Sequence, residues 1–240
     1  MSRQDQIIQR ASFNALVDAG VYSADFDHPR QLKDFVASTV AENALCRAGE
    51  RPTQVLDCGC GTGAWLAYLG TLFEKAARDG DFFGFDLSDR MIEVARNKLA
   101  GQIDATHIQR GDLLEEAAYR FDGVGNGFDL IFVFDAIQQL PPSRQYEACE
   151  LMVEQLAPGG VMLVFDHDKS SPYGRKMARK KFVTRYLGIP LVPRYYCRAK
   201  YPPLNKFAER LTRRKGLSAN VRVAGDCPKM ALVINKEERS

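Results

Sequence analysis

Residues 54–66 read QVLDCGCGTGAWL, a short apolar run that ends in an acid and continues into three glycines at alternate positions. Glycine permits a tight turn and lets a ligand lie directly against peptide groups. In an open α/β sheet, the crevice beyond the carboxyl ends of the strands is where ligands bind. The stretch therefore predicts a strand, a sharp turn with a binding crevice, and a helix that begins near Ala64.

Short apolar runs and helical patterns alternate through the middle of the chain. The runs that predict strands are 54–58, 81–88, 106–114, 128–137 and 159–168. The helical patterns between them are 64–77, 89–100 and 143–156. This alternation predicts a mostly parallel sheet covered by helices on both faces. Right-handed crossovers then bring the carboxyl ends of the strands to one edge.

The two ends of the chain have a different texture. Residues 1–50 predict helices, and residues 219–223 and 229–236 predict a β-hairpin. Between residues 169 and 215, fifteen lysines and arginines accompany a single acid, which indicates an anionic partner or a solvated basic face. We expect one domain over 1–240, with four parts: a helical segment (1–50), a cofactor-binding core (51–168), a basic substrate cap (169–215) and a C-terminal hairpin (216–240).

Composition excludes several classes of protein. No apolar run approaches the roughly 18 residues that a membrane span needs, and no apolar leader segment follows the polar start. Six cysteines at irregular spacings predict free thiols and a cytoplasmic location. Cys58 and Cys60 lack the second cysteine pair of a zinc site, so no metal is expected.

The glycine turn does not fit the common phosphate-binding patterns. It lacks the lysine followed by serine or threonine of a Walker loop. Gly59, Gly61 and Ala64 do satisfy G-x-G-x-x-A, so a nicotinamide-dependent oxidoreductase is an alternative. However, Asp57 places an anion where a pyrophosphate would lie, and this favours a ligand with a positive end.

These residues resemble the class I S-adenosylmethionine-dependent methyltransferases of the small-molecule type. The first motif of that family, acid-x-Gly-x-Gly-x-Gly, is matched by Asp57, Gly59, Gly61 and Gly63. The later motifs are matched, in order, by Asp86, Asp112, the run FDLIFVFDAI (128–137) and LAPGG (156–160). The resemblance covers residues 50–168 closely and the C-terminal hairpin more loosely.

The resemblance implies a fold and a cofactor. The fold is a three-layer, Rossmann-like, seven-stranded and mostly parallel sheet with an antiparallel last strand, and the cofactor is S-adenosylmethionine. In the family, the acid matched by Asp86 holds the ribose hydroxyls, and the acid matched by Asp112 faces the adenine amino group. The cofactor-binding residues that we expect are Tyr22, Asp57, Cys58, Gly59, Gly61, Gly63, Asp86, Leu87, Met91, Gly111, Asp112, Leu113 and Phe134.

Methyl transfer from a sulfonium requires a positioned acceptor and the exclusion of water. A general base is needed only where the acceptor must lose a proton. His167 is the candidate base, because an imidazole titrates near neutrality, with an ordinary hydrogen-bonded surface histidine as the alternative. The substrate-binding residues that we expect are Gln138, Asp166, Arg175, Arg179, Tyr195 and Tyr196.

The bases and aromatic residues of the cap suit a small or lipidic acceptor that carries a phosphate, diphosphate or carboxylate. Peripheral contact with an anionic membrane would require a similar composition. RNA methylation is the alternative, because lysines and arginines interleaved with aromatic rings also bind single-stranded RNA. Against it, we recognise no separate RNA-binding module in the sequence. The sequence leaves the methylated atom and the oligomeric state open.

Overall fold

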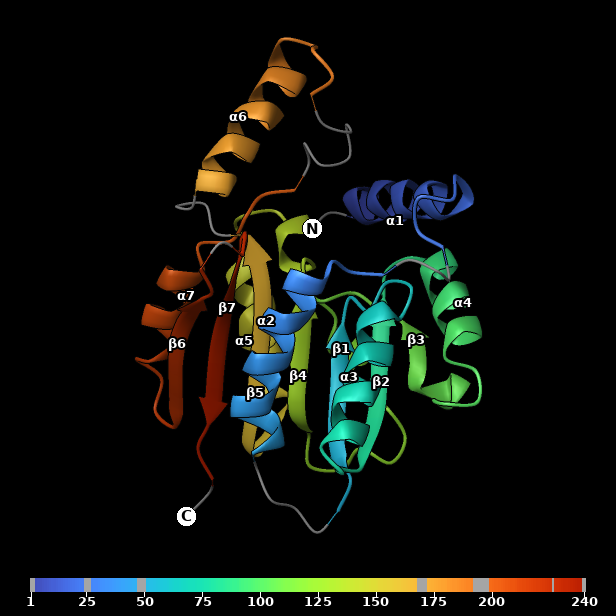
Figure 1. Cartoon of the computed structure of the whole chain (residues 1–240), viewed down its shortest axis with the longest axis vertical. Helices are drawn as coiled ribbons and strands as arrows, with labels where there is room; N and C mark the ends of the chain where they lie inside the picture. The colour runs from blue at the N-terminus through green and yellow to red at the C-terminus, as the bar shows by residue number, and fades with distance from the viewer. Residues whose placement is uncertain are drawn as a thin grey trace.

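The computed structural model describes residues 3–23, 27–46, 51–167, 172–191, 199–225 and 227–238 (Figure 1). Within this part of the chain, seven strands form a single sheet in the order β3-β2-β1-β4-β5-β7-β6. The strands are β1 Thr53–Cys58, β2 Gly80–Asp86, β3 Ile108–Arg110, β4 Phe128–Phe134, β5 Leu156–His167, β6 Leu217–Val223 and β7 Lys229–Lys236. β7 runs antiparallel to the other six strands of this sheet, and this confirms the fold that the sequence predicts.

The helices cover both faces of this sheet. They are α1 Arg3–Asp18, α2 Arg30–Val40, α3 Ala64–Lys75, α4 Asp89–Lys98, α5 Gln145–Glu154, α6 Pro172–Tyr186 and α7 Leu204–Leu211. In Figure 1, α2 and α3 lie in front of the sheet, whereas α5 lies behind it. A π-helical turn, Ala41–Leu45, extends α2. None of the helices in the described ranges is both long and apolar enough to cross a bilayer.

The central strand β4 contributes side chains to the hydrophobic clusters on both faces of the sheet. Successive side chains of a strand point to opposite faces, so its unbroken apolar run buries residues on both sides. Leu130 and Phe132 pack in the cluster that contains the α2 and α3 side chains. Ile131 and Val133 pack in the other cluster, with residues of α5 and α7.

The largest differences from the predicted strand bounds are in β3, β4 and β5, whereas β1, β2 and β6 differ by one or two residues at either end. The strand expected over 128–137 ends at Phe134, because Asp135 has a left-handed φ of 57°. The strand expected over 106–114 contains only Ile108–Arg110, and the Asp112 side chain accepts a hydrogen bond from the Leu114 amide that turns the chain. The strand expected over 159–168 begins earlier, at Leu156, where it pairs with Phe128 before a register shift.

Two helices lie beyond the carboxyl edge of the sheet, at the top of Figure 1. Helix α1 crosses this edge beside α4, and none of its described side chains is buried. Polar contacts attach it: Gln6–Asp112 at 2.6 Å, Asn14–Ser88 at 2.6 Å, Asp18–Arg90 at 2.9 Å and Arg10–Asp89 at 3.2 Å. Helix α6, with the basic residues of the predicted cap, stands farther from the sheet.

Candidate active site

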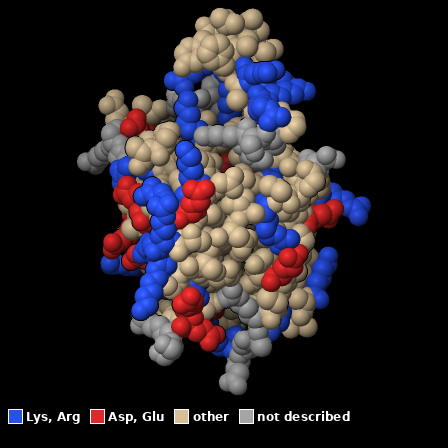
Figure 2. All heavy atoms as spheres, turned by 90° about the vertical axis from the view of Figure 1, so that its left-hand side faces the viewer, with Lys and Arg blue, Asp and Glu red and all other residues tan. Residues whose placement is uncertain are grey.

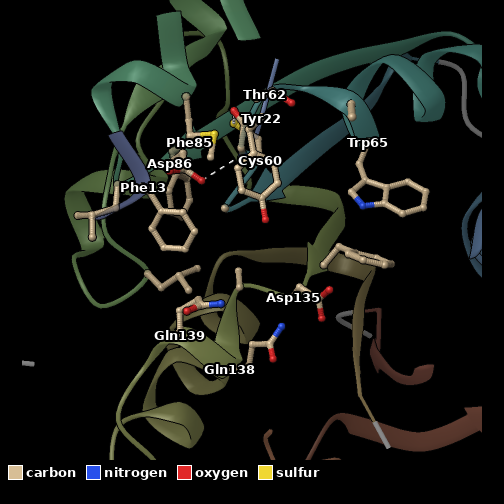
Figure 3. A pocket seen from close by; sticks show the side chains of 18 of the residues that line it. Phe13, Tyr22, Cys60, Thr62, Trp65, Phe85, Asp86, Asp135, Gln138 and Gln139 are labelled. Atoms are coloured by element: carbon tan, nitrogen blue, oxygen red, sulfur yellow. Dashed lines mark hydrogen bonds between the residues drawn. The ribbon is translucent and has the colours of Figure 1, made fainter. Parts of the chain in front are cut away.

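A cavity of about 320 Å³ opens at the carboxyl ends of β1, β2, β3 and β4. The turns that follow these strands supply most of its described lining. Gln9 and Phe13 of α1 also contribute, as do Tyr22, His28 and Leu32. Figure 3 shows the side chains of Asp86 and Asp135 on different sides of this space. The cavity therefore lies in the crevice where the sequence places the binding site.

The glycine turn after β1 combines close packing with an open peptide surface. A Cβ atom on Gly59 would lie 2.6 Å from the Ala136 Cβ, so this glycine permits the turn to touch the end of β4. A Cβ atom on Gly61 would meet no atom within 4 Å, and Gly61 lines the cavity. Gly61 therefore presents bare peptide to a ligand, whereas Gly59 is required for packing.

Asp86 joins the end of β2 to this turn. Its Oδ2 accepts the Gly61 amide proton at 3.0 Å, and its Oδ1 accepts the Ser88 amide proton at 2.9 Å. Burial raises the pKa of this carboxyl, while the backbone hydrogen bonds act in the opposite direction. Each carboxylate oxygen has a second lone pair, so both can accept hydroxyl protons from a ligand in the cavity.

Asp57 lies behind the turn rather than in the cavity lining. Its side chain is buried, and neither carboxylate oxygen has a hydrogen-bond partner. Burial and the nearby charge of Asp86 raise the pKa of Asp57 well above its ordinary value. A buried acid without a partner is costly unless a positive group compensates it, so the site fits a cationic ligand.

The structure brings most of the expected cofactor residues together. Those that line the cavity are Tyr22, Gly59, Gly61, Asp86, Leu87, Met91, Gly111, Asp112, Leu113 and Phe134. Asp57, Cys58 and Gly63 do not line it. Cys58 is fully buried at the end of β1, and Cys60 lines the cavity instead, because Gly59 between them has a left-handed φ of 82° and turns the chain. Gly63 packs against α4, where an added Cβ would lie 2.8 Å from Leu99.

The side of the cavity next to β4 has an aromatic wall that includes a histidine. The His28 ring stacks on Trp65 with centroids 4.2 Å apart and lies 5.3 Å from the Phe134 centroid. Burial lowers the pKa of His28 to about 4, so the imidazole is neutral at pH 7. A neutral imidazole has one nitrogen that can accept a proton.

A buried ion pair fixes the acid at the end of β4. Lys229, which is only 3% exposed, pairs with Asp135, and its Nζ lies 5.0 Å from the Phe134 ring centroid. Asp166 is fully buried beside this pair and accepts the His167 amide proton at 2.7 Å. Burial and the charge of Asp135 raise the pKa of Asp166 above its ordinary value.

The residues predicted to bind the acceptor are more scattered. Gln138 lines the cavity, Asp166 is buried outside its lining, and Arg175 and Arg179 are exposed on α6. Tyr195 and Tyr196 lie outside the described residues. Among the residues that the structure describes, no lysine or arginine lines the cavity.

His167, the predicted base, also lies outside the cavity lining. Its ring is stacked on Tyr173 with centroids 5.6 Å apart and contacts Tyr201 at 4.6 Å. Burial lowers its pKa to about 4. The role of His167 stays a prediction, whereas His28, which the sequence analysis did not single out, lies in the cavity wall.

Residues 55–160 match the family model of the methyltransferase domain. This segment is a class I S-adenosylmethionine-dependent methyltransferase domain. The match covers most of β1, all of β2, β3 and β4, the start of β5, and the turns after β1 to β4 that line the cavity. The methyltransferase domain therefore contains the glycine turn, Asp86, Asp112 and Asp135.

Curated relatives of the methyltransferase domain include a trans-aconitate 2-methyltransferase from Deinococcus radiodurans, 33% identical over 149 residues. That alignment covers 60% of this chain and 51% of the relative, so the chain spans about half the relative's length. A demethylmenaquinone methyltransferase from Listeria welshimeri is 23% identical, over 67% of this chain and 68% of the relative.

Solved methyltransferase structures share the fold. The magnesium protoporphyrin IX methyltransferase from Synechocystis PCC 6803, solved with bound SAH, superposes with a TM-score of 0.64 at 16% identity. The superposition covers 97% of this chain and 100% of that one. The shared architecture therefore extends beyond residues 55–160 to the N-terminal helices and the C-terminal hairpin.

Proposed function

We propose that this protein transfers a methyl group from S-adenosylmethionine to a small or lipidic organic acceptor. The observation that carries this proposal is the position of the cavity, bounded by the glycine turn and Asp86 on one side and by an aromatic wall on the other. S-adenosylmethionine supplies a methyl group on a positively charged sulfur. We also propose that residues 1–240 act as one domain, with residues 169–215 as its cap.

The side of the cavity between the glycine turn and β3 has the features of a cofactor site, and we call it the cofactor side. The bare peptide of Gly61 allows close approach, and the Asp86 oxygens can accept the two ribose hydroxyls. Leu87 and Met91 line the same side with apolar surface suited to the adenine ring. The unpartnered carboxyl of Asp57 favours a ligand that carries positive charge.

The side next to β4, which we call the acceptor side, has the features needed to hold and deprotonate an acceptor. The stacked rings of His28, Trp65 and Phe134 exclude water from this wall. The neutral imidazole of His28 can accept the proton that an oxygen or carbon acceptor loses. Asp135, fixed by Lys229, adds a second acceptor of hydrogen bonds.

The acceptor that we propose has an apolar body and an anionic group. The aromatic wall suits the body, and the bases of α6 lie beyond the same edge of the sheet. The two relatives described above are named for trans-aconitate, a carboxylate, and for demethylmenaquinone, a quinone. Because the described residues of the cavity lining include no lysine or arginine, the anionic group would extend toward the cap.

The cofactor assignment is tested by thermal shift. S-adenosylmethionine and SAH should each raise the melting temperature, because a ligand that binds only the folded state stabilises it. NADH, the ligand of the alternative oxidoreductase, should leave the melting temperature unchanged. Stabilisation by NADH and not by SAH would overturn the assignment.

The acceptor class is tested by mass spectrometry. The protein and S-adenosylmethionine are incubated separately with polycarboxylates, isoprenoid quinols, lipid phosphates and RNA. A methyl adduct on a carboxylate, quinol or lipid phosphate is the expected result. Methylation of RNA alone would instead favour the alternative in which the cap binds a nucleic acid.

The cap's contribution is tested by reversing charge on α6. Arg175→Glu with Arg179→Glu should raise the KM for a water-soluble anionic acceptor and leave the affinity for SAH unchanged. Lys75→Glu with Arg120→Glu, on exposed bases of other elements, is the matched control. An unchanged KM in the α6 variant would remove the cap from acceptor binding.

A further inference from the structure

Helix α6 carries an unusual charge distribution for a surface helix. It contains six bases and no acid, and no acid follows before Leu191. Most surface helices mix both signs, and like charges on one helix repel each other. Figure 2 shows basic side chains beside uncharged surface at this end of the molecule, with the acidic side chains mainly below it. The helix therefore has a surface that favours an anionic partner.

The outward side of α6 combines these bases with aromatic rings. Arg175, Arg179, Phe182 and Tyr186 recur at intervals of four, three and four residues, which places them on one side of a helix. All four are exposed, and the rings of Phe182 and Tyr186 lie 4.9 Å apart. On this helix only Gly174 and Thr184 are buried, so a single narrow side packs against the protein.

Exposed apolar surface is concentrated at the end of α6 and just beyond it. Phe182, Tyr186 and Leu187 are 58%, 65% and 63% exposed. Ile189 and Leu191 follow at 49% and 47%. A group of large apolar side chains in water does not stabilise the fold and marks a binding surface.

We propose that this surface, residues 172–191, docks on an anionic membrane surface. Lysine and arginine side chains pair with lipid phosphates, while aromatic and aliphatic side chains enter the boundary between head groups and acyl chains. A second copy of this chain would oppose the same six bases to one another. RNA would use the bases and rings but would leave Leu187, Ile189 and Leu191 in water.

Docking through this surface would affect how a lipidic acceptor reaches the cavity. Helix α6 stands beyond the carboxyl edge of the sheet, the edge at which the cavity also opens. A docked protein would therefore present that edge to the membrane, where a lipidic acceptor resides. The docking itself goes beyond the proposed function and does not depend on it.

The proposal is tested by co-sedimentation of the full chain with lipid vesicles. We expect binding to vesicles that contain phosphatidylserine, weaker binding as salt is added, and little binding to phosphatidylcholine alone. Lys176→Gln with Arg179→Gln and Arg185→Gln should lower the partition coefficient about 100-fold, because each base near an anionic surface contributes separately. Lys75→Gln with Arg120→Gln and Lys206→Gln removes the same charge elsewhere and should change it little.

The apolar contribution needs its own variant. Phe182→Ser with Leu187→Ser should weaken binding and should do so even at high salt, where the charges are screened. Val223→Ser, at a 67% exposed position on β6, is the matched control. Equal binding of the wild type and both α6 variants to the vesicles would overturn the proposal, as would binding to a single-stranded oligonucleotide but not to vesicles.

A thermal shift with SAH separates this proposal from the proposed function. The α6 variants should retain the wild-type shift, because their substitutions lie outside the cavity lining. Loss of vesicle binding with a retained shift supports docking. An absent shift in the wild type would reject the cofactor site and leave the docking result as it stands.

Discussion

The cofactor side and the acceptor side of the cavity are built by different means. The cofactor side is mostly backbone: the Gly61 peptide, and the amides of Gly61 and Ser88 that hold Asp86 in place. The acceptor side is mostly side chains from distant parts of the sequence, such as His28 stacked on Trp65 and Lys229 paired with Asp135. One side depends on local geometry, and the other depends on tertiary packing.

This difference matters for the chemistry each side can perform. Backbone amides and a strand-end acid suit one unvarying ligand, because their positions follow from the sheet. Side chains from four separate segments can be exchanged without altering the sheet, and this permits different acceptors on the same core. Substitutions on the two sides should therefore separate the chemical step from cofactor binding.

The largest effect is expected on the acceptor side. His28→Gln should lower kcat about 100-fold with an acceptor that must lose a proton, because general base catalysis typically contributes at least this much. The affinity for SAH, measured by calorimetry, should change little. His167→Gln provides the comparison for the base that the sequence favoured, and a larger loss in that variant would return the role to His167.

On the cofactor side, Asp86→Ala should weaken SAH binding roughly 10- to 100-fold. Hydrogen bonds to a charged group contribute about 1.5–3 kcal/mol, which corresponds to this range. Calorimetry gives the affinity, and circular dichroism checks that the variant is folded. Unchanged affinity in a folded variant would place the ribose elsewhere and would remove the distinction between the two sides.

Asp57→Asn should have opposite effects on stability and binding. The buried acid has a raised pKa, so above about pH 4 the unfolded state releases this proton more readily than the folded state, and folding becomes less favourable. The amide avoids this cost, so the ligand-free variant should melt at a higher temperature at pH 7. The gain should disappear as the pH falls to the ordinary carboxyl pKa.

The same substitution should weaken SAH binding several-fold, since the negative charge available to a cationic ligand is lost. Titration calorimetry of wild type and variant at pH 7 gives the comparison. A variant that is more stable yet binds SAH as tightly as the wild type would show that Asp57 has no role in the cofactor site.

The smallest expected effect is a decrease in folding stability at mildly acidic pH. His28 and His167 both have pKa values lowered to about 4 by burial. Because an unfolded histidine titrates near 6.5, the unfolded state binds more protons between these values, and stability should decrease as pH falls through this window. Each imidazole contributes up to about 1.4 kcal/mol per pH unit. Urea unfolding at pH 7 and pH 5 should show a smaller difference in His28→Gln.

The cofactor side was largely predictable because its motifs specify backbone positions. A glycine turn after a buried strand fixes where Gly61 lies, and a strand-end acid fixes Asp86. The structure differs from the expected lining only locally: Cys60 rather than Cys58 lines the cavity, and Gly63 packs against α4. Both depend on the direction of single residues in a tight turn, which a motif does not determine.

The acceptor side was not predictable in the same way. His28 lies on an irregular segment, and its ring contacts with Trp65 and Phe134 bring it into the wall. His167 was singled out because it ends β5, but its ring contacts Tyr173 and Tyr201 outside the cavity lining. Sequence periodicity carries no information about contacts between side chains of different segments.

The way in which helix α1 is attached bears on how the demethylated cofactor would leave the cavity. It contributes Gln9 and Phe13 to the cavity lining, yet it is attached through hydrogen bonds and exposed ion pairs instead of buried apolar side chains. Water can replace the exposed ion pairs at little cost. We therefore expect α1 to separate from the edge of the sheet more readily than the strands separate from one another, which would open the cavity on the side that we assign to the cofactor.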